Sequence, residues 1–139
     1  MSLFNIFNIA GTALNAQSLR LNTTASNMAN ANSAASSSGA TYRAREPVFE
    51  PLMGDAFDPN AAADAGVKVV GIVESQAPLR HEYQPGSPLA DADGYVFLPN
   101  VNVVEEMANM ISASRSYQTN VEVMESSKRM LQQTLALGQ

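Results

Sequence analysis

Apolar residues recur every seven positions near both ends of this 139-residue chain, and the spacing predicts two long helices. A seven-residue repeat held over several turns is typical of a helix that packs lengthwise against other helices. The first repeat predicts a helix from about Leu3 to about Ala31. Its apolar set is Phe7, Leu14, Leu21 and Met28, and its companion set, mostly small or polar, is Leu3, Ala10, Gln17, Thr24 and Ala31.

The second repeat predicts a helix that spans about Val103 to Leu137. Either Asn100 or Asn102 can cap its start, because a side-chain oxygen there accepts a hydrogen bond from a free backbone N–H. Glu105 and Glu106 stand in the early turns, where the helix dipole favours acidic side chains. One seam set is Met110, Tyr117, Met124 and Leu131, and the other is Val103, Met107, Ser114, Val121, Lys128 and Leu135.

Short segments between the two helices are rich in β-branched or aromatic residues, which predicts strands. These segments are Tyr42–Phe49, Val67–Ser75, Arg80–Tyr83 and Tyr95–Leu98. Ser, Gly, Ala, Asp and Pro dominate the predicted loops Ala34–Thr41 and Met53–Gly66 and the predicted turn Gln84–Pro88. The predicted fold is therefore α+β, with the terminal helices pairing as a coiled-coil-like core and a small irregular β domain inserted between them. The expected divisions are 1–33 for the N-terminal helix, 34–99 for the linker and β domain, and 100–139 for the C-terminal helix.

Charge is distributed unevenly along the chain. Arg20 is the only charged residue before Arg43, although the whole chain carries a net charge of −5. The first helix has an uncharged polar face made of Asn15, Ser18, Asn22, Ser26 and Asn30. A solvated helix normally carries Lys and Glu there, so this face favours burial against other helices. The acidic balance argues against binding nucleic acid, and no apolar run is long enough to predict a membrane span.

Few residues of this chain are suited to catalysis or metal binding. Without Cys there are no thiolate ligands or Cys nucleophiles, and His81 is the single histidine, so a zinc site would need three carboxylates around it. The segment Asp91–Gly94 resembles the start of a calcium loop, but Asn102 stands where that loop needs a Glu. A turn leading into a strand is the better interpretation. We therefore expect no enzyme activity, no catalytic or metal-binding residue and no cofactor.

Two groups of side chains are candidates for subunit contacts. The predicted subunit-packing residues are Phe7, Leu14, Leu21, Met28, Met110, Tyr117, Met124 and Leu131. The candidates for polar contacts between subunits are Arg20, Asn27, Asn30, Arg115 and Asn120. An isolated charge on a helix meant for burial often has a defined partner, and an ordinary surface position is the alternative for both arginines.

Several segments resemble the flagellar rod and hook proteins. The N-terminal signature is similar at residues 14–21 (LNAQSLRL) and 25–32 (ASNMANAN), and the C-terminal one at 100–107 (NVNVVEEM), 113–120 (ASRSYQTN) and 134–138 (TLALG). Residues 66–69 (GVKV), 83–90 (YQPGSPLA) and 93–96 (DGYV) resemble the proximal rod proteins of this family in particular. The resemblance covers nearly the whole chain, and the N-terminal and C-terminal signatures occur in the order that the family has.

The resemblance implies a structural subunit of the bacterial flagellar basal-body rod, which polymerises through its terminal helices into a helical drive shaft that transmits motor torque. It implies a periplasmic location, reached through the flagellar type III export apparatus without a cleaved signal peptide. The implied partners are other copies of the chain, other rod proteins, basal-body ring and adapter proteins, the rod cap and the export apparatus.

A different class of protein is the alternative: a soluble helical adaptor or peptide-binding module that does not polymerise. The methionines of the second helix could line a promiscuous peptide groove, since Met adapts to irregular surfaces. They are Met107, Met110, Met124 and Met130. Their helical spacing favours seam packing instead, and the uncharged face of the first helix also argues against a module that stays in solution.

Overall fold

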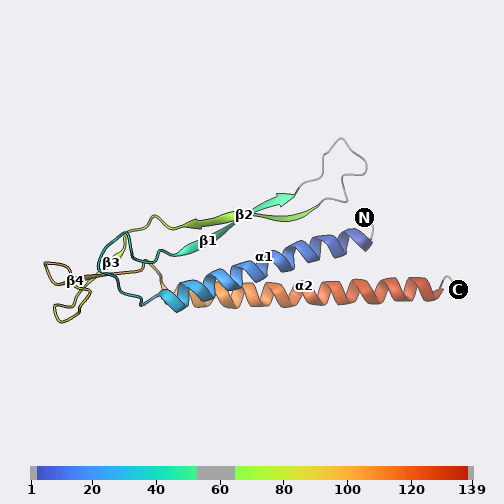
Figure 1. Cartoon of the computed structure of the whole chain (residues 1–139). Helices are drawn as coiled ribbons and strands as arrows, with labels where there is room; N and C mark the ends of the chain where they lie inside the picture. Colours follow the sequence, from blue (N-terminus) through green and yellow to red (C-terminus); the bar gives the residue numbers. More distant parts are fainter. Residues whose placement is uncertain (1–2, 53–64, 138–139) are drawn as a thin grey trace.

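Two long antiparallel helices dominate the elongated structure, a computed structural model that describes residues 3–52 and 65–137 (Figure 1). Helix α1 spans Leu3–Asn30 and helix α2 spans Val103–Leu137, so both predicted helices are confirmed to within one residue. The start of α1 and the end of α2 lie at the same end of the molecule. The α+β fold is confirmed. The predicted loop Met53–Gly66 lies mostly outside the described residues, and its last residue already belongs to a strand.

Local side-chain chemistry sets the ends of the helices. The Asn102 side-chain oxygen accepts a hydrogen bond from Val104 N–H at 3.2 Å, so Asn102 is the N-cap of α2. At the other boundary, the carbonyl of Asn30 accepts hydrogen bonds from the backbone N–H and the hydroxyl of Ser33, at 3.0 and 2.8 Å. These bonds satisfy a carbonyl that the end of α1 leaves without a helical partner.

Small side chains form the contact between the helices. Ala113 and Ser127 of α2 are 0% and 2% exposed, and α1 is the main element that packs against α2 in the described residues. Ala10 and Thr24 of α1 are also buried, at 3% and 4% exposure. Small residues allow two helices to approach closely, so many weak dispersion contacts form along the whole length of the pair.

A first hairpin lies along α1 on the side away from α2 (Figure 1). It pairs β1, Arg45–Leu52, with β2, Gly66–Glu74, in antiparallel register. A bulge between the pairs Val48–Gly71 and Phe49–Val69 leaves Val70 as the extra residue of β2. Bulges bend a strand and increase its twist, which helps a narrow ribbon follow a helix.

Thr12 attaches this hairpin to α1. Its hydroxyl donates to the Ile9 carbonyl at 2.8 Å and accepts from the Val67 N–H at 3.1 Å. A Cβ added at Gly66 would lie 2.7 Å from the Thr12 hydroxyl oxygen, so only glycine fits this approach without displacing the side chain.

A second hairpin stands at the end of the molecule opposite the start of α1 (Figure 1). It pairs β3, Arg80–Tyr83, with β4, Tyr95–Leu98, as both strands were predicted. Phe97 extends this sheet by exchanging two backbone hydrogen bonds with Ala35, at 2.9 and 3.1 Å. Over its described residues, the inserted region therefore forms two separate two-stranded sheets.

The β2 prediction was within one residue, whereas the prediction of a strand at Tyr42–Phe49 was displaced. Strand β1 begins three residues later and ends at Leu52. The displacement has a physical reason, because Tyr42 and the backbone of Ala44 bond to side chains from other elements. The Tyr42 hydroxyl donates to Asn27 at 2.8 Å, and Ala44 N–H donates to Asn100 at 2.8 Å.

The predicted turn at Asp91–Gly94 is confirmed. The Asp91 carboxylate accepts hydrogen bonds from the backbone N–H groups of Asp93 and Tyr95, at 3.0 and 2.8 Å. Gly94 has a φ of 84°, in the left-handed region that glycine adopts without strain. The calcium-like sequence thus serves to close the β3–β4 hairpin.

Substituting Gly94 with alanine is expected to destabilise the protein by about 1–2 kcal/mol. The added Cβ would lie 2.8 Å from the Tyr83 ring, at a backbone angle of +84°. Gly86→Ala is the matched control, since it lies nearby and a Cβ there meets nothing within 4 Å. Urea denaturation followed by circular dichroism measures both variants, and equal losses would contradict this account.

Neither helix is long and apolar enough, over the described residues, to cross a membrane.

Candidate functional site: the helix pair and its polar junction

One buried asparagine joins α1, β1 and α2. Asn27 is 1% exposed, and its side-chain nitrogen donates to the Arg45 carbonyl at 2.9 Å and to a Glu106 carboxylate oxygen at 2.8 Å. Its side-chain oxygen accepts from the Tyr42 hydroxyl at 2.8 Å and from the Arg45 N–H at 2.9 Å. Two donors and two lone pairs are all that an amide side chain has, so Asn27 is fully satisfied inside the subunit.

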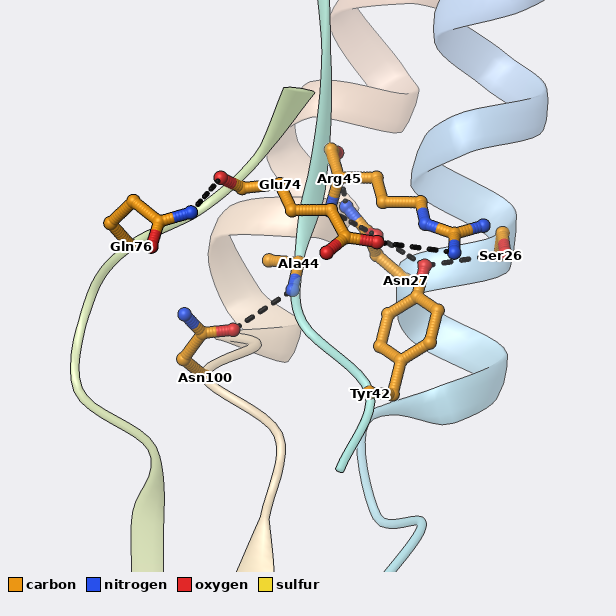
Figure 2. A network of polar contacts seen from close by, with 8 residues as sticks. All are labelled: Ser26, Asn27, Tyr42, Ala44, Arg45, Glu74, Gln76 and Asn100. Carbon is orange, nitrogen blue, oxygen red and sulfur yellow. Dashed lines mark hydrogen bonds and ion pairs between the residues drawn. The ribbon is translucent and has the colours of Figure 1, made fainter. Parts of the chain in front are cut away.

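Residues around Asn27 support this arrangement (Figure 2). Ser26 approaches the Tyr42 hydroxyl at 3.4 Å, and the Arg45 guanidinium lies 5.4 Å from the centre of the Tyr42 ring. Arg45 also pairs with Glu74 at 3.3 Å, but both side chains are about half exposed, at 49% and 52%. Exposed ion pairs contribute little, roughly 0–1 kcal/mol, so the buried amide contributes more to the junction.

Asn100 forms a second connection, between the segment before α2 and the residues on either side of the first hairpin. Its oxygen accepts from Ala44 N–H at 2.8 Å (Figure 2), and its nitrogen donates to the carbonyls of Ser75 and Ala77 at 3.3 and 3.0 Å. Arg80 adds bonds to the carbonyls of Pro99 and Ala31, both at 3.2 Å. We call Asn27, Asn100, Arg80 and their partners the polar junction.

Arg20, the isolated charge on the first helix, has a partner within the subunit. Its guanidinium donates to the Asn109 side-chain oxygen of α2 at 2.9 Å. This bond and the Asn27–Glu106 bond connect the same two helices from different turns. Together they fix the position of α1 along α2, since a shift of either helix would break both.

The other polar candidates lie in different surroundings. Asn30 and Asn120 each donate to a carbonyl four residues earlier in their own helix, at 2.8 and 2.9 Å. Arg115 is exposed on α2. Of the five predicted polar contacts, Arg20 and Asn27 therefore take part in contacts between the two helices of one subunit.

The predicted packing residues flank the contact between the helices rather than fill it. Tyr117 is 38% exposed. The others are half-buried: Phe7, Leu14, Leu21, Met28, Met110, Met124 and Leu131. On α2 the buried positions include Ala113 and Ser127, which are fourteen residues apart and belong to a seven-residue set that sequence reasoning missed. That set was detectable by its spacing, but its small side chains gave no hydrophobic signal.

Much of the helix pair stays uncovered in a single subunit. The side of α1 away from α2 and the hairpin exposes only small or amide side chains, namely Asn8, Asn15, Asn22, Ala25 and Ala29. We call these five residues the open face of α1. The outer side of α2 exposes Val104, Met107 and Ile111, at 76%, 50% and 54%, and we call these three residues the apolar patch of α2.

No three His, Asp or Glu side chains of the described residues gather closely enough to hold a metal ion. His81 lies exposed on β3 with its ring 4.7 Å from that of Phe97, an edge-to-face contact between neighbouring strands. The candidate site therefore consists of the polar junction and the uncovered faces of the two helices.

Comparison with known families identifies the class of protein that carries such surfaces. Residues 7–34 match the family described as "Flagella basal body rod protein". Residues 92–137 match the family described as "Flagellar basal body rod FlgEFG protein C-terminal". Both matches fall mainly on the two long helices, so the chain is a flagellar rod protein.

Full-length relatives narrow this class to one member. The chain is 55% identical over 139 residues to the flagellar basal-body rod protein FlgC of Escherichia coli O157:H7 and to that of Salmonella typhimurium, with 100% of each chain covered. It is 41% identical over 141 residues, again with full coverage, to FlgC of Buchnera aphidicola subsp. Acyrthosiphon pisum. The chain therefore belongs to the FlgC family of flagellar basal-body rod proteins and is a structural subunit of the rod.

Proposed function

We propose that this chain polymerises through its terminal helices into a helical drive shaft that transmits motor torque, and that it has no catalytic role. The observation that carries the proposal is the division of the helix surface. Polar groups at the junction bond within the subunit, while charge-free and apolar helix faces remain uncovered. Exposed apolar area of this kind marks contact surfaces in soluble proteins.

The half-buried seam residues support the same proposal. Each large apolar side chain that becomes fully buried contributes on the order of 1.5–3 kcal/mol relative to leaving it exposed. Phe7, Leu14 and Met124 are only partly covered by the helix pair, so a neighbouring subunit can complete their burial. Many such contacts, repeated around a shaft, distribute a torsional load over all its subunits.

The proposal extends to location and partners. The chain works in the periplasmic part of the basal body, which it reaches through the flagellar type III export apparatus without loss of an N-terminal signal. Its neighbours are other copies of itself, other rod proteins, ring and adapter proteins, and the rod cap. Support comes from the family to which the chain belongs.

Deletion and complementation test the proposed role. A strain that lacks this chain is expected to be non-motile and to have no complete rod in electron micrographs of its basal bodies. Complementation with the wild-type chain is expected to restore both, and the chain recovered from basal bodies is expected to have the mass of the uncleaved polypeptide, about 14.8 kDa. Motile deletion cells would overturn the structural role, and a shortened N-terminus would overturn the export route.

A further inference from the structure

The apolar patch of α2 has the spacing of a helix-packing seam. Val104, Met107 and Ile111 are separated by three and four residues, which places them on one side of the helix. Glu106, by contrast, points to α1, where it bonds Asn27. The patch therefore lies on the outer side of α2, where the described residues leave it at least half exposed.

The open face of α1 carries only small or amide side chains. Asn8, Asn15, Asn22 and Ala29 are spaced by seven, and Gly11, Ser18 and Ala25 form a second seven-residue set beside them. No side chain of this surface is larger than asparagine. A Cβ built on Gly11 meets nothing within 4 Å, so the surface there is open. Such a shallow, even surface can receive large side chains from another helix.

Charge selects between the possible occupants of the apolar patch. Beyond Ile111, the outer side of α2 carries Arg115, Glu122 and Arg129, whose burial against apolar atoms would be costly. The open face of α1 carries no charge, and Ala25 and Ala29 make one end of it the least polar. That end can cover Met107 and Ile111 without desolvating a charged group.

We propose that the apolar patch of α2 in one copy packs on the Ala25–Ala29 end of the open face of α1 in a second copy. The proposal rests on the proposed function and names the two surfaces by which like subunits meet. Because these two surfaces differ, the contact is head-to-tail. Each copy contacts one neighbour through its apolar patch and another through its open face. Contacts of this kind close into rings or continue as helices, whereas a self-complementary patch would stop at a dimer.

Cysteine cross-linking between two different variants tests the pairing. The natural chain has no Cys, so each introduced thiol is unique. Ala29→Cys and Met107→Cys chains, carrying different tags, are co-expressed in the deletion strain, and oxidised basal bodies are analysed by electrophoresis. Because each chain has one thiol, a mixed disulfide must join two copies, and it requires the two Cα atoms to approach within about 7 Å. The mixed dimer is expected to exceed either homodimer at least fivefold.

Ala29→Cys with Glu122→Cys is the matched control, because Glu122 is also exposed on the outer side of α2. Dominant homodimers, or equal cross-linking in the control, would overturn the pairing while leaving the rod role intact. Failure of the wild-type chain to enter basal bodies would instead overturn the proposed function.

A charge exchange provides a second, independent measurement. Ala29→Glu alone and Met107→Lys alone are each expected to lower incorporation into basal bodies at least fivefold, because each places a charge against an apolar surface. The double variant is expected to recover most of the loss, because every contact between copies then pairs opposite charges. A double variant no better than the single ones would show that positions 29 and 107 do not meet.

Discussion

Replacement of Asn27 with alanine is expected to lower the free energy of unfolding by about 3 kcal/mol, one of the two largest effects of a single substitution in this chain. The variant removes four hydrogen bonds at once. It leaves the Arg45 N–H and the Glu106 carboxylate without the partner that Asn27 provides. A buried polar group that loses its partner costs roughly 1–3 kcal/mol, and the low dielectric of the junction increases that cost.

Asn22→Ala is the control for this prediction. Asn22 lies on the same helix but is exposed on the open face of α1, and alanine is the better helix former, so we expect a change within about 0.5 kcal/mol. Urea denaturation followed by circular dichroism at 222 nm measures both variants. If the two substitutions cost the same, the hydrogen bonds of Asn27 do not hold the junction together.

Asn27→Asp separates hydrogen bonding from volume. The substitution keeps the size of the side chain and both acceptor contacts, with Tyr42 and with the Arg45 N–H. It also replaces the donor that faces Glu106 by an oxygen, so two carboxylates would repel each other at the distance of the present bond. We expect it to be at least as destabilising as Asn27→Ala, which a simple loss of packing would not produce.

The sequence predicted the long elements well because their signals are local. Seven-residue repeats and a cap at Asn100 or Asn102 placed the ends of α1 and α2 to within one residue, and the structure identifies Asn102 as the cap. Strand β4 also lies where aromatic and β-branched residues indicated, and β3 lies at the segment that was predicted beside it. Each of these signals acts over a few neighbouring residues, so it can be interpreted without knowing the tertiary contacts.

The junction could not be predicted in the same way, because its contacts join residues far apart in the chain. Asn27 and Glu106 are 79 residues apart, and nothing near either one indicates the other. In the sequence, Asn27 is one of many polar residues on a helix with poor intrinsic propensity. The late start of β1 has the same origin, because Tyr42 and Ala44 are held by side chains from distant segments.

Hydrophobicity alone does not indicate which side of each helix faces the other helix. Phe7, Leu14 and Leu21 are the largest apolar residues of their repeat, yet they are only half-buried. The contact itself uses smaller residues, which let the two helices approach closely so that many weak dispersion contacts form along their length. A single sequence does not reveal how closely two helices approach. It therefore cannot decide whether the contact is formed by small residues or by large apolar ones.

Enlarging one of the small residues of that contact, Ala113, is the second substitution with a large expected effect. Ala113→Leu is expected to destabilise the protein by about 3 kcal/mol, at the upper end of the range for overpacked cores. Ala113 is 0% exposed at the contact between α1 and α2, so three extra carbon atoms have no space unless the helices separate. Separation would also stretch the Arg20–Asn109 and Asn27–Glu106 bonds, which are already at 2.9 and 2.8 Å.

Ala108→Leu makes the same chemical change at an exposed position of α2, where we expect an effect within about 0.5 kcal/mol. Thermal and urea unfolding of the two variants compare the sites directly, and hydrogen exchange at the Asn109 and Glu106 amides reports whether α2 has moved away from α1. Faster exchange at both amides is expected in Ala113→Leu alone. Equal stability of the two variants would mean that small residues do not set the distance between the helices. The contact between α1 and α2 would then have to lie along the larger residues.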